Sequence, residues 1–163
     1  MKKIHLLAAI LFILPLFTGC KNEKADMPSP IISDMQVMDK NLYNKIKEEN
    51  KGKIVLINFF ASWCPPCKME TPDFVDVYNQ YKDKNFIIIG VSGDDNKKNA
   101  VDFVNRYGIE YPVYIADKSF QAYYGVSKYP TTFLLDKGGK LVDIYEGMLT
   151  KDYLIQLAAA GGD

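Results

Sequence analysis

The sequence predicts a mixed α/β fold, with a central sheet that is flanked by helices on both faces. Two apolar runs, at residues 54–60 and 86–91, lack the alternation of a half-exposed strand, as expected when both faces are covered. A helical pattern follows each run. Further on, two glycines in residues 137–140 separate two more strand-like runs and predict a hairpin.

The first half of the chain supplies the two buried strands and the helices beside them. Residues 34–37 predict a short strand, and residues 41–50 predict a helix whose apolar residues lie on one side. A buried strand follows at residues 53–60. Residues 65–82 keep apolar residues at helical spacing, and residues 85–92 predict the second buried strand.

The second half adds shorter elements and the hairpin. A helix is expected at residues 96–107, because apolar residues recur at helical spacing and Gly108 stands where a helix ends. The remaining expected elements are a strand at 113–116, a short helix at 119–124, hairpin strands at 131–136 and 141–145, and a closing helix at 151–160.

Charge and composition exclude several classes of protein. The 163 residues fit one domain, and 20 Lys and Arg balance 20 Asp and Glu, which argues against nucleic acid as a partner. The single histidine is His5, so the predicted domain has no Cys–His catalytic pair. We expect no metal site, because Cys64 and Cys67 are two ligands and structural zinc takes four Cys or His ligands.

The N-terminus has the pattern of a secretory signal peptide. Two lysines precede an apolar stretch, residues 4–17, that is too short to span a membrane comfortably. The ending before Cys20 resembles a bacterial lipobox, so we expect residues 1–19 to be removed and Cys20 to be lipidated. Residues 20–33 would form a tether and residues 34–163 the domain, anchored outside the cytoplasm on the periplasmic side. Secretion with a free Cys20 and an uncleaved anchor are the alternatives.

The chemistry centres on Cys64-Pro65-Pro66-Cys67, where a buried strand ends and a helix begins. Unpaired N–H groups and the positive dipole end of a helix start favour a thiolate at Cys64. Both prolines fit the first helical turn, where a missing N–H costs little. The motif therefore predicts a dithiol/disulfide exchange enzyme that needs no other cofactor. Half a zinc site and a structural bridge are the alternatives.

These residues resemble the landmarks of the thioredoxin family, over roughly residues 34–160. The resemblance includes the stretches 59–68 and 129–133, with Pro72 and Gly147. Within the family, the lipobox, the Cys-Lys-x-Glu-x-Pro pattern at 67–72 and an extra helix and strand at about 94–116 resemble the TlpA/ResA-like branch. A thioredoxin-like fold is therefore expected, with that insert placed before the cis-proline strand.

The resemblance implies roles for individual residues. Cys64 would be the nucleophile, nearer to solvent, and Cys67 the resolving thiol. Glu70, three residues past Cys67, would accept the proton of the inner thiol, with a solvated surface Glu as the alternative. Asn58 stands where many thioredoxins carry a buried acid, and an amide is no base, which strengthens the assignment of Glu70.

Three residues are expected to contact the substrate. Pro130 resembles the family's cis-proline, which faces the dithiol, and a trans proline at the edge of a strand is the alternative. Tyr129 would offer backbone groups to an incoming peptide, and Trp63 would pack beside the motif and shape the contact surface.

The expected function is reduction of protein disulfides outside the cytoplasm, with cytochrome c maturation as the pathway that the resemblance implies. Partners would be disulfide-bearing proteins such as apocytochrome c, a membrane thiol reductant of the DsbD/CcdA type, and the membrane through the lipid; a monomer is expected. The two prolines supply no charge, so a potential nearer about −270 mV than about −120 mV is expected. The alternatives are a peroxiredoxin-like thiol peroxidase and a non-catalytic thioredoxin-like binding module.

Overall fold

The computed structural model describes residues 35–162. The expected signal peptide, the lipidated Cys20 and the tether lie outside the described residues, so the predicted domain boundaries stay predictions. Among residues 35–162, every helix is too short or too polar to cross a membrane.

Six strands form one mixed sheet in the order β1–β4–β3–β2–β5–β6. In chain order the strands are β1 (Val37–Met38), β2 (Ile54–Phe60), β3 (Phe86–Ser92), β4 (Val113–Ala116), β5 (Thr131–Leu135) and β6 (Leu141–Glu146). Strands β1 to β4 are parallel to one another. Strand β5 pairs antiparallel with β2, and β6 pairs antiparallel with β5. The predicted fold class is therefore confirmed, and the expected hairpin is formed by β5 and β6.

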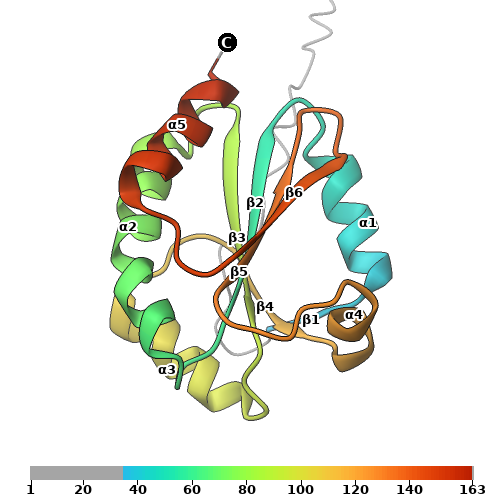
Figure 1. Cartoon of the computed structure of the whole chain (residues 1–163), viewed down its shortest axis with the longest axis vertical. Coiled ribbons are helices and arrows are strands. Elements are labelled where there is room, and N and C mark those ends of the chain that lie inside the picture. Colours follow the sequence, from blue (N-terminus) through green and yellow to red (C-terminus); the bar gives the residue numbers. More distant parts are fainter. Residues whose placement is uncertain (1–34, 163) are drawn as a thin grey trace, which may run out of the picture.

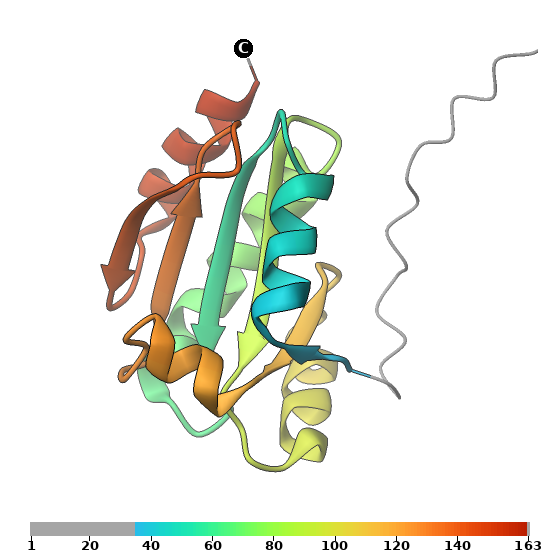
Figure 2. The same ribbon diagram turned by 90° about the vertical axis from the view of Figure 1, so that its right-hand side faces the viewer.

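In the part of the chain that the structure describes, five helices cover the two faces of this sheet, which Figure 1 and Figure 2 show from two directions. They are α1 (Lys40–Glu49), α2 (Pro65–Tyr81), α3 (Lys97–Tyr107), α4 (Lys118–Tyr123) and α5 (Lys151–Gly161). Helices α2, α3 and α5 lie on one face, and α1 and α4 lie on the other.

The buried strands show no polar alternation because each side of the sheet has its own apolar layer. Along β2, Leu56 and Phe60 belong to the layer beneath α2, α3 and α5. Val55, Ile57 and Phe59, which point to the opposite face of the sheet, belong to the layer beneath α1 and α4. Both sets are buried, as the continuous apolar run of the sequence predicts.

Most expected elements are present with their bounds shifted by a few residues. The first strand is formed by Val37 and Met38 and not by residues 34–37. Helix α1 begins at Lys40 because the Asp39 carboxylate caps it, accepting the N–H of Leu42 at 2.7 Å. At the end of α3, Gly108 adopts the left-handed conformation (φ 61°) that the sequence predicts for a helix C-terminus.

The topology brings three segments together at one edge of the sheet. Strands β2 and β3 are parallel, so their C-terminal ends meet at the same edge, and α2 begins there directly after β2. Strand β5 runs the opposite way and starts at that edge, because Thr131 pairs with Phe59. The insert contributes α3 and β4, and β4 pairs with β3 on the side of β3 that faces away from β2.

Candidate active site

Cys64 and Cys67 form a disulfide at the start of α2, with their Cα atoms 5.3 Å apart. Cys64 is the N-cap residue of the helix, and its sulfur accepts the backbone N–H of Cys67 at 3.3 Å. Pro65 and Pro66 fill the first two helical positions, as expected. When the pair is reduced, a thiolate at Cys64 would occupy the positive end of the helix dipole.

Both sulfurs are well covered in this oxidised form. The exposed fraction is 2% for Cys64 and 0% for Cys67, so the expected difference in exposure between the two thiols is small. Trp63, by contrast, is 63% exposed although it directly precedes Cys64. The indole is therefore far more exposed than the disulfide that follows it in the chain.

The loop before β5 lies against the motif. The Tyr129–Pro130 peptide bond is cis, as the resemblance to the thioredoxin family implies. The ring of Tyr129 meets Trp63 edge to face, with centroids 5.8 Å apart, and its hydroxyl accepts a hydrogen bond from the side-chain amide of Gln121. A Cβ atom at Gly93 would lie 1.9 Å from that hydroxyl oxygen, so a residue without a side chain is needed there.

Glu70 is buried beneath the motif and is not on the helix surface. Its side chain is 1% exposed, which shows that the alternative of a solvated surface Glu is wrong. Oε1 accepts the amide N–H of Asn58 at 2.8 Å, and Oε2 accepts the backbone N–H of Leu149 at 3.2 Å. Asn58, itself 4% exposed, also donates to the hydroxyl of Thr132 at 3.0 Å.

This environment gives Glu70 an unusual acidity. Burial raises the pKa of its carboxyl to about 7, and the hydrogen bonds from Asn58 and Leu149 offset only part of that effect. A carboxyl that gains and loses its proton near neutral pH suits proton exchange with a thiol. The buried Tyr111 lies near Glu70, and burial together with that carboxylate raises the pKa of its phenol.

A second buried carboxylate fixes the loop that leads to Cys64. Asp94, 4% exposed, accepts the backbone N–H and the hydroxyl of Ser62, at 2.9 and 2.7 Å. It also accepts the hydroxyl of Ser92 at 2.8 Å. Asp94 follows the end of the buried strand β3, and this position is the sequence signal that it lies at the edge of the sheet where α2 begins. The sequence does not show that its partner is Ser62.

The structure brings most of the expected site residues together. Cys64, Cys67, Trp63, Tyr129 and Pro130 lie around the start of α2, joined by the disulfide and the ring contact. Glu70 lies one turn further along the same helix, on its buried side. Cys20 lies outside the described residues. The roles assigned to these residues stay predictions.

The sequence does not predict the hydrogen-bond partners of Glu70 or the hydrogen bonds that hold Ser62 to Asp94. Thr132 faces Asn58 across the β2–β5 ladder, and this contact depends on the pairing register of the two strands. Leu149 reaches Glu70 from the segment before α5, a separation of 79 residues. Neither contact has a local sequence signal.

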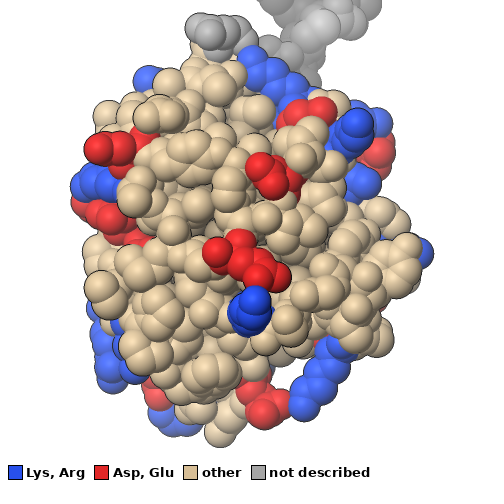
Figure 3. All heavy atoms as spheres, viewed as in Figure 1, with Lys and Arg blue, Asp and Glu red and all other residues tan. Residues whose placement is uncertain are grey.

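The disulfide is the redox centre of the site. Within residues 35–162, no three Cys, His, Asp or Glu side chains are grouped so that they could hold a metal ion. Charged side chains of both signs are interspersed on the face shown in Figure 3, in keeping with the balanced composition.

This fold, with a dithiol at a helix N-terminus beside a cis-proline, is that of a thiol–disulfide oxidoreductase. Residues 28–144 match the model of the AhpC/TSA family. The thiol-disulfide oxidoreductase ResA of Bacillus thuringiensis is 34% identical, over 94% of this chain and 95% of the relative. The thioredoxin-like protein YneN of Bacillus subtilis is 36% identical, over 67% of this chain and 65% of the relative.

A solved structure of a related protein has the same fold. A thiol:disulfide interchange protein of the thioredoxin family from Chlorobium tepidum superposes with a TM-score of 0.65 at 29% identity, over 71% of this chain and 83% of that one. The chain belongs to the AhpC/TSA family and, within the thioredoxin superfamily, is a TlpA/ResA-like oxidoreductase.

Proposed function

We propose that this protein reduces disulfides of other proteins outside the cytoplasm, through the Cys64–Cys67 dithiol. The observation that carries the proposal is the disulfide at the N-cap of α2 above a buried Glu70 whose pKa is about 7. The position of Cys64 at the helix N-terminus supports its role as the attacking thiol, and the raised pKa of Glu70 supports its role as proton acceptor for Cys67.

The reaction begins with the reduced protein. The Cys64 thiolate attacks one sulfur of the substrate disulfide, a mixed disulfide forms, and the other substrate sulfur leaves as a thiolate that takes a proton from water. Cys67 then gives its proton to Glu70 and attacks the Cys64 sulfur. The second substrate thiolate leaves, the Cys64–Cys67 disulfide forms, and two electrons have passed to the substrate.

A donor must then return two electrons to the oxidised protein. We propose a membrane thiol reductant of the DsbD/CcdA type as this donor and apocytochrome c among the substrates, in cytochrome c maturation. The resemblance of the motif to the TlpA/ResA-like branch supports this assignment. The signal-like N-terminus and the lipobox before Cys20 support anchoring by lipid on the outer face of a membrane.

Trapping of partners tests the proposal. Without the resolving thiol, Cys67→Ala should accumulate mixed disulfides through Cys64, and the double variant Cys64→Ala/Cys67→Ala should accumulate none. We expect proteins with paired cysteines among those captured, apocytochrome c included. The proposal fails if Cys67→Ala captures no more protein than the double variant.

A thiol peroxidase of the peroxiredoxin type is less well supported. That chemistry predicts a threonine three residues before the nucleophile, and Ala61 stands at that position. Rapid consumption of hydrogen peroxide by the reduced protein would favour the peroxidase over disulfide exchange.

A further inference from the structure

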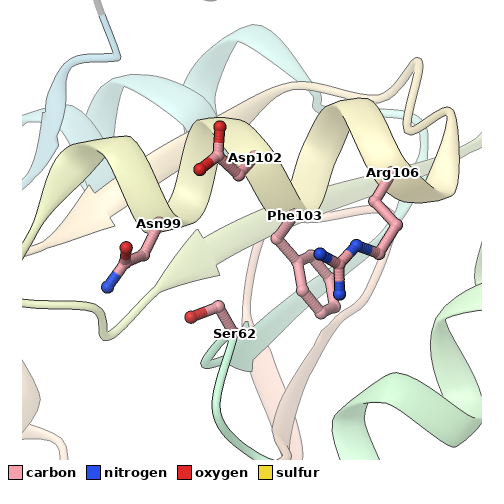
Figure 4. A pocket seen from close by; sticks show the side chains of 5 residues that line it. All are labelled: Ser62, Asn99, Asp102, Phe103 and Arg106. Atoms are coloured by element: carbon pink, nitrogen blue, oxygen red, sulfur yellow. The ribbon is translucent and has the colours of Figure 1, made fainter.

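A polar pocket lies between α3 and the loop that leads to Cys64, outside the disulfide site. Ser62, Asn99, Asp102, Phe103 and Arg106 line this hollow of about 230 Å³. Ser62 belongs to the loop, and the other four residues belong to the insert helix, where they share one face at helical spacing. Figure 4 shows Asn99 and Arg106 extending from α3 on the side where Ser62 lies.

The walls of the pocket are held in place. Asp94 fixes Ser62 through both the backbone N–H and the hydroxyl of that residue. The base is Phe103, which is 3% exposed and stacks on Phe60 with ring centroids 4.8 Å apart. The pocket is therefore built on a buried aromatic pair and a fixed loop.

The charge that is free in this pocket is positive. Asp102 pairs with Lys98 at 2.6 Å, and Figure 4 shows its carboxylate turned away from the guanidinium of Arg106. Arg106 is the single arginine of the chain, and within residues 35–162 it has no ion pair or hydrogen bond through its side chain. Lys98 and Asp102 neutralise each other, which leaves the positive charge of Arg106 among the residues that line the pocket. The Asp94 carboxylate lies behind Ser62, where it is buried and accepts hydrogen bonds from Ser62 and Ser92.

The hydrogen-bonding groups point to the same ligand. The Ser62 hydroxyl already donates to Asp94, so the donors available to a ligand are the Asn99 amide and the Arg106 guanidinium. A guanidinium binds a carboxylate through two parallel N–H groups. A neutral amide beside it adds a third donor.

We propose that this pocket receives an acidic side chain of the protein substrate while its disulfide is over Cys64. The proposal rests on the proposed function and names a recognition element for it. Ser62 is separated from Cys64 by Trp63 alone, so a carboxylate at Arg106 would lie close to the sulfurs that react. Arg106 and Asn99 would thus favour disulfides that carry an Asp or Glu nearby.

The test uses matched peptides and the reduced full chain. Each peptide contains one disulfide and a single Glu, which is moved along the residues that flank the disulfide, and each has a partner with Gln at the same position. The rate constant for reduction is followed by the fluorescence of Trp63, the single tryptophan, which contacts the site. With the native protein, at least one Glu position should react about two- to fivefold faster than its Gln partner at low salt.

Variants assign this preference to the pocket. In Arg106→Gln the Glu and Gln peptides should react equally, and the rate for the Gln peptides should stay as in the native protein. Arg106→Lys keeps the charge but loses the paired donors and should show a reduced preference. The control Lys45→Gln removes the same charge from α1 on the other face of the sheet, and it should keep the native preference.

Two results would overturn the proposal. One is that no Glu position reacts faster than its Gln partner, and the other is that Arg106→Gln keeps the native preference. If the native protein reduces none of the peptides, the proposed function itself fails, and this proposal fails with it. The rate with the Gln peptides separates these cases.

Discussion

Replacement of Glu70 by Gln should remove most of the pH dependence of stability between pH 5 and pH 8. Burial raises the pKa of the Glu70 carboxyl from 4.5 to about 7 in the folded protein. As the pH rises, the unfolded protein therefore loses the Glu70 proton at a lower pH than the folded protein does. The free energy of unfolding must fall over this range and become nearly constant above about pH 8.

The size of the effect follows from the two pKa values. The rise of the carboxyl pKa from 4.5 to about 7 corresponds to about 3 kcal/mol over the full range, and most of that is lost between pH 5 and pH 8. Few other groups titrate in this interval, because the single histidine is His5. Both proteins keep that residue, so its contribution cancels in the comparison.

Urea unfolding of the oxidised full chain, followed by far-ultraviolet circular dichroism, measures this difference. Between pH 5 and pH 8, the free energy of unfolding of the native protein should fall by about 2–3 kcal/mol more than that of Glu70→Gln. Glu49→Gln, which changes an exposed carboxyl on α1, should behave like the native protein. Equal pH dependence in the native protein and Glu70→Gln would refute the raised pKa.

Other expectations concern the groups around the disulfide. Gly93→Ala should lower the free energy of unfolding by about 1–3 kcal/mol, because the new methyl group meets the Tyr129 hydroxyl. In chemical unfolding, Gly93→Ala should cost less in a Tyr129→Ala background than in the native protein. Asp94→Asn should lower the free energy of unfolding by about 1–3 kcal/mol and slow the reduction of peptide disulfides, because an amide cannot accept all three hydrogen bonds. Unchanged reduction rates would show that Asp94 does not position the loop of Ser62. Equilibration with glutathione and dithiothreitol should place the potential of the disulfide nearer about −270 mV than about −120 mV, and a value near the latter would contradict a reductant.

The sequence predicts those parts of the molecule whose signal is local. The buried strands, the dithiol at a helix start and the C-terminal glycine of α3 are each encoded in a few adjacent residues, and the structure contains all three. Recognition of the family added the cis bond before Pro130.

The rest of the site depends on contacts between distant segments. Burial raises the pKa of Glu70, and the hydrogen bonds from Asn58 and Leu149 offset part of that rise. Asp94 reaches Ser62 across 32 residues. Such contacts follow from the pairing of strands and from the packing of α2 and α5 against the sheet, which periodicity alone does not give. The pocket at Arg106 arises in the same way, from the packing of the insert helix beside the loop of Ser62.

The central claim is that the Cys64–Cys67 dithiol transfers electrons to protein disulfides, and insulin reduction tests it most directly. With dithiothreitol as the electron source, precipitation of the freed insulin B chain is followed by turbidity. We predict that the full chain accelerates precipitation and that Cys64→Ala reduces the rate to that of dithiothreitol alone. A full chain that gives no acceleration, or a Cys64→Ala variant as active as the native protein, would contradict the claim and favour a non-catalytic binding module.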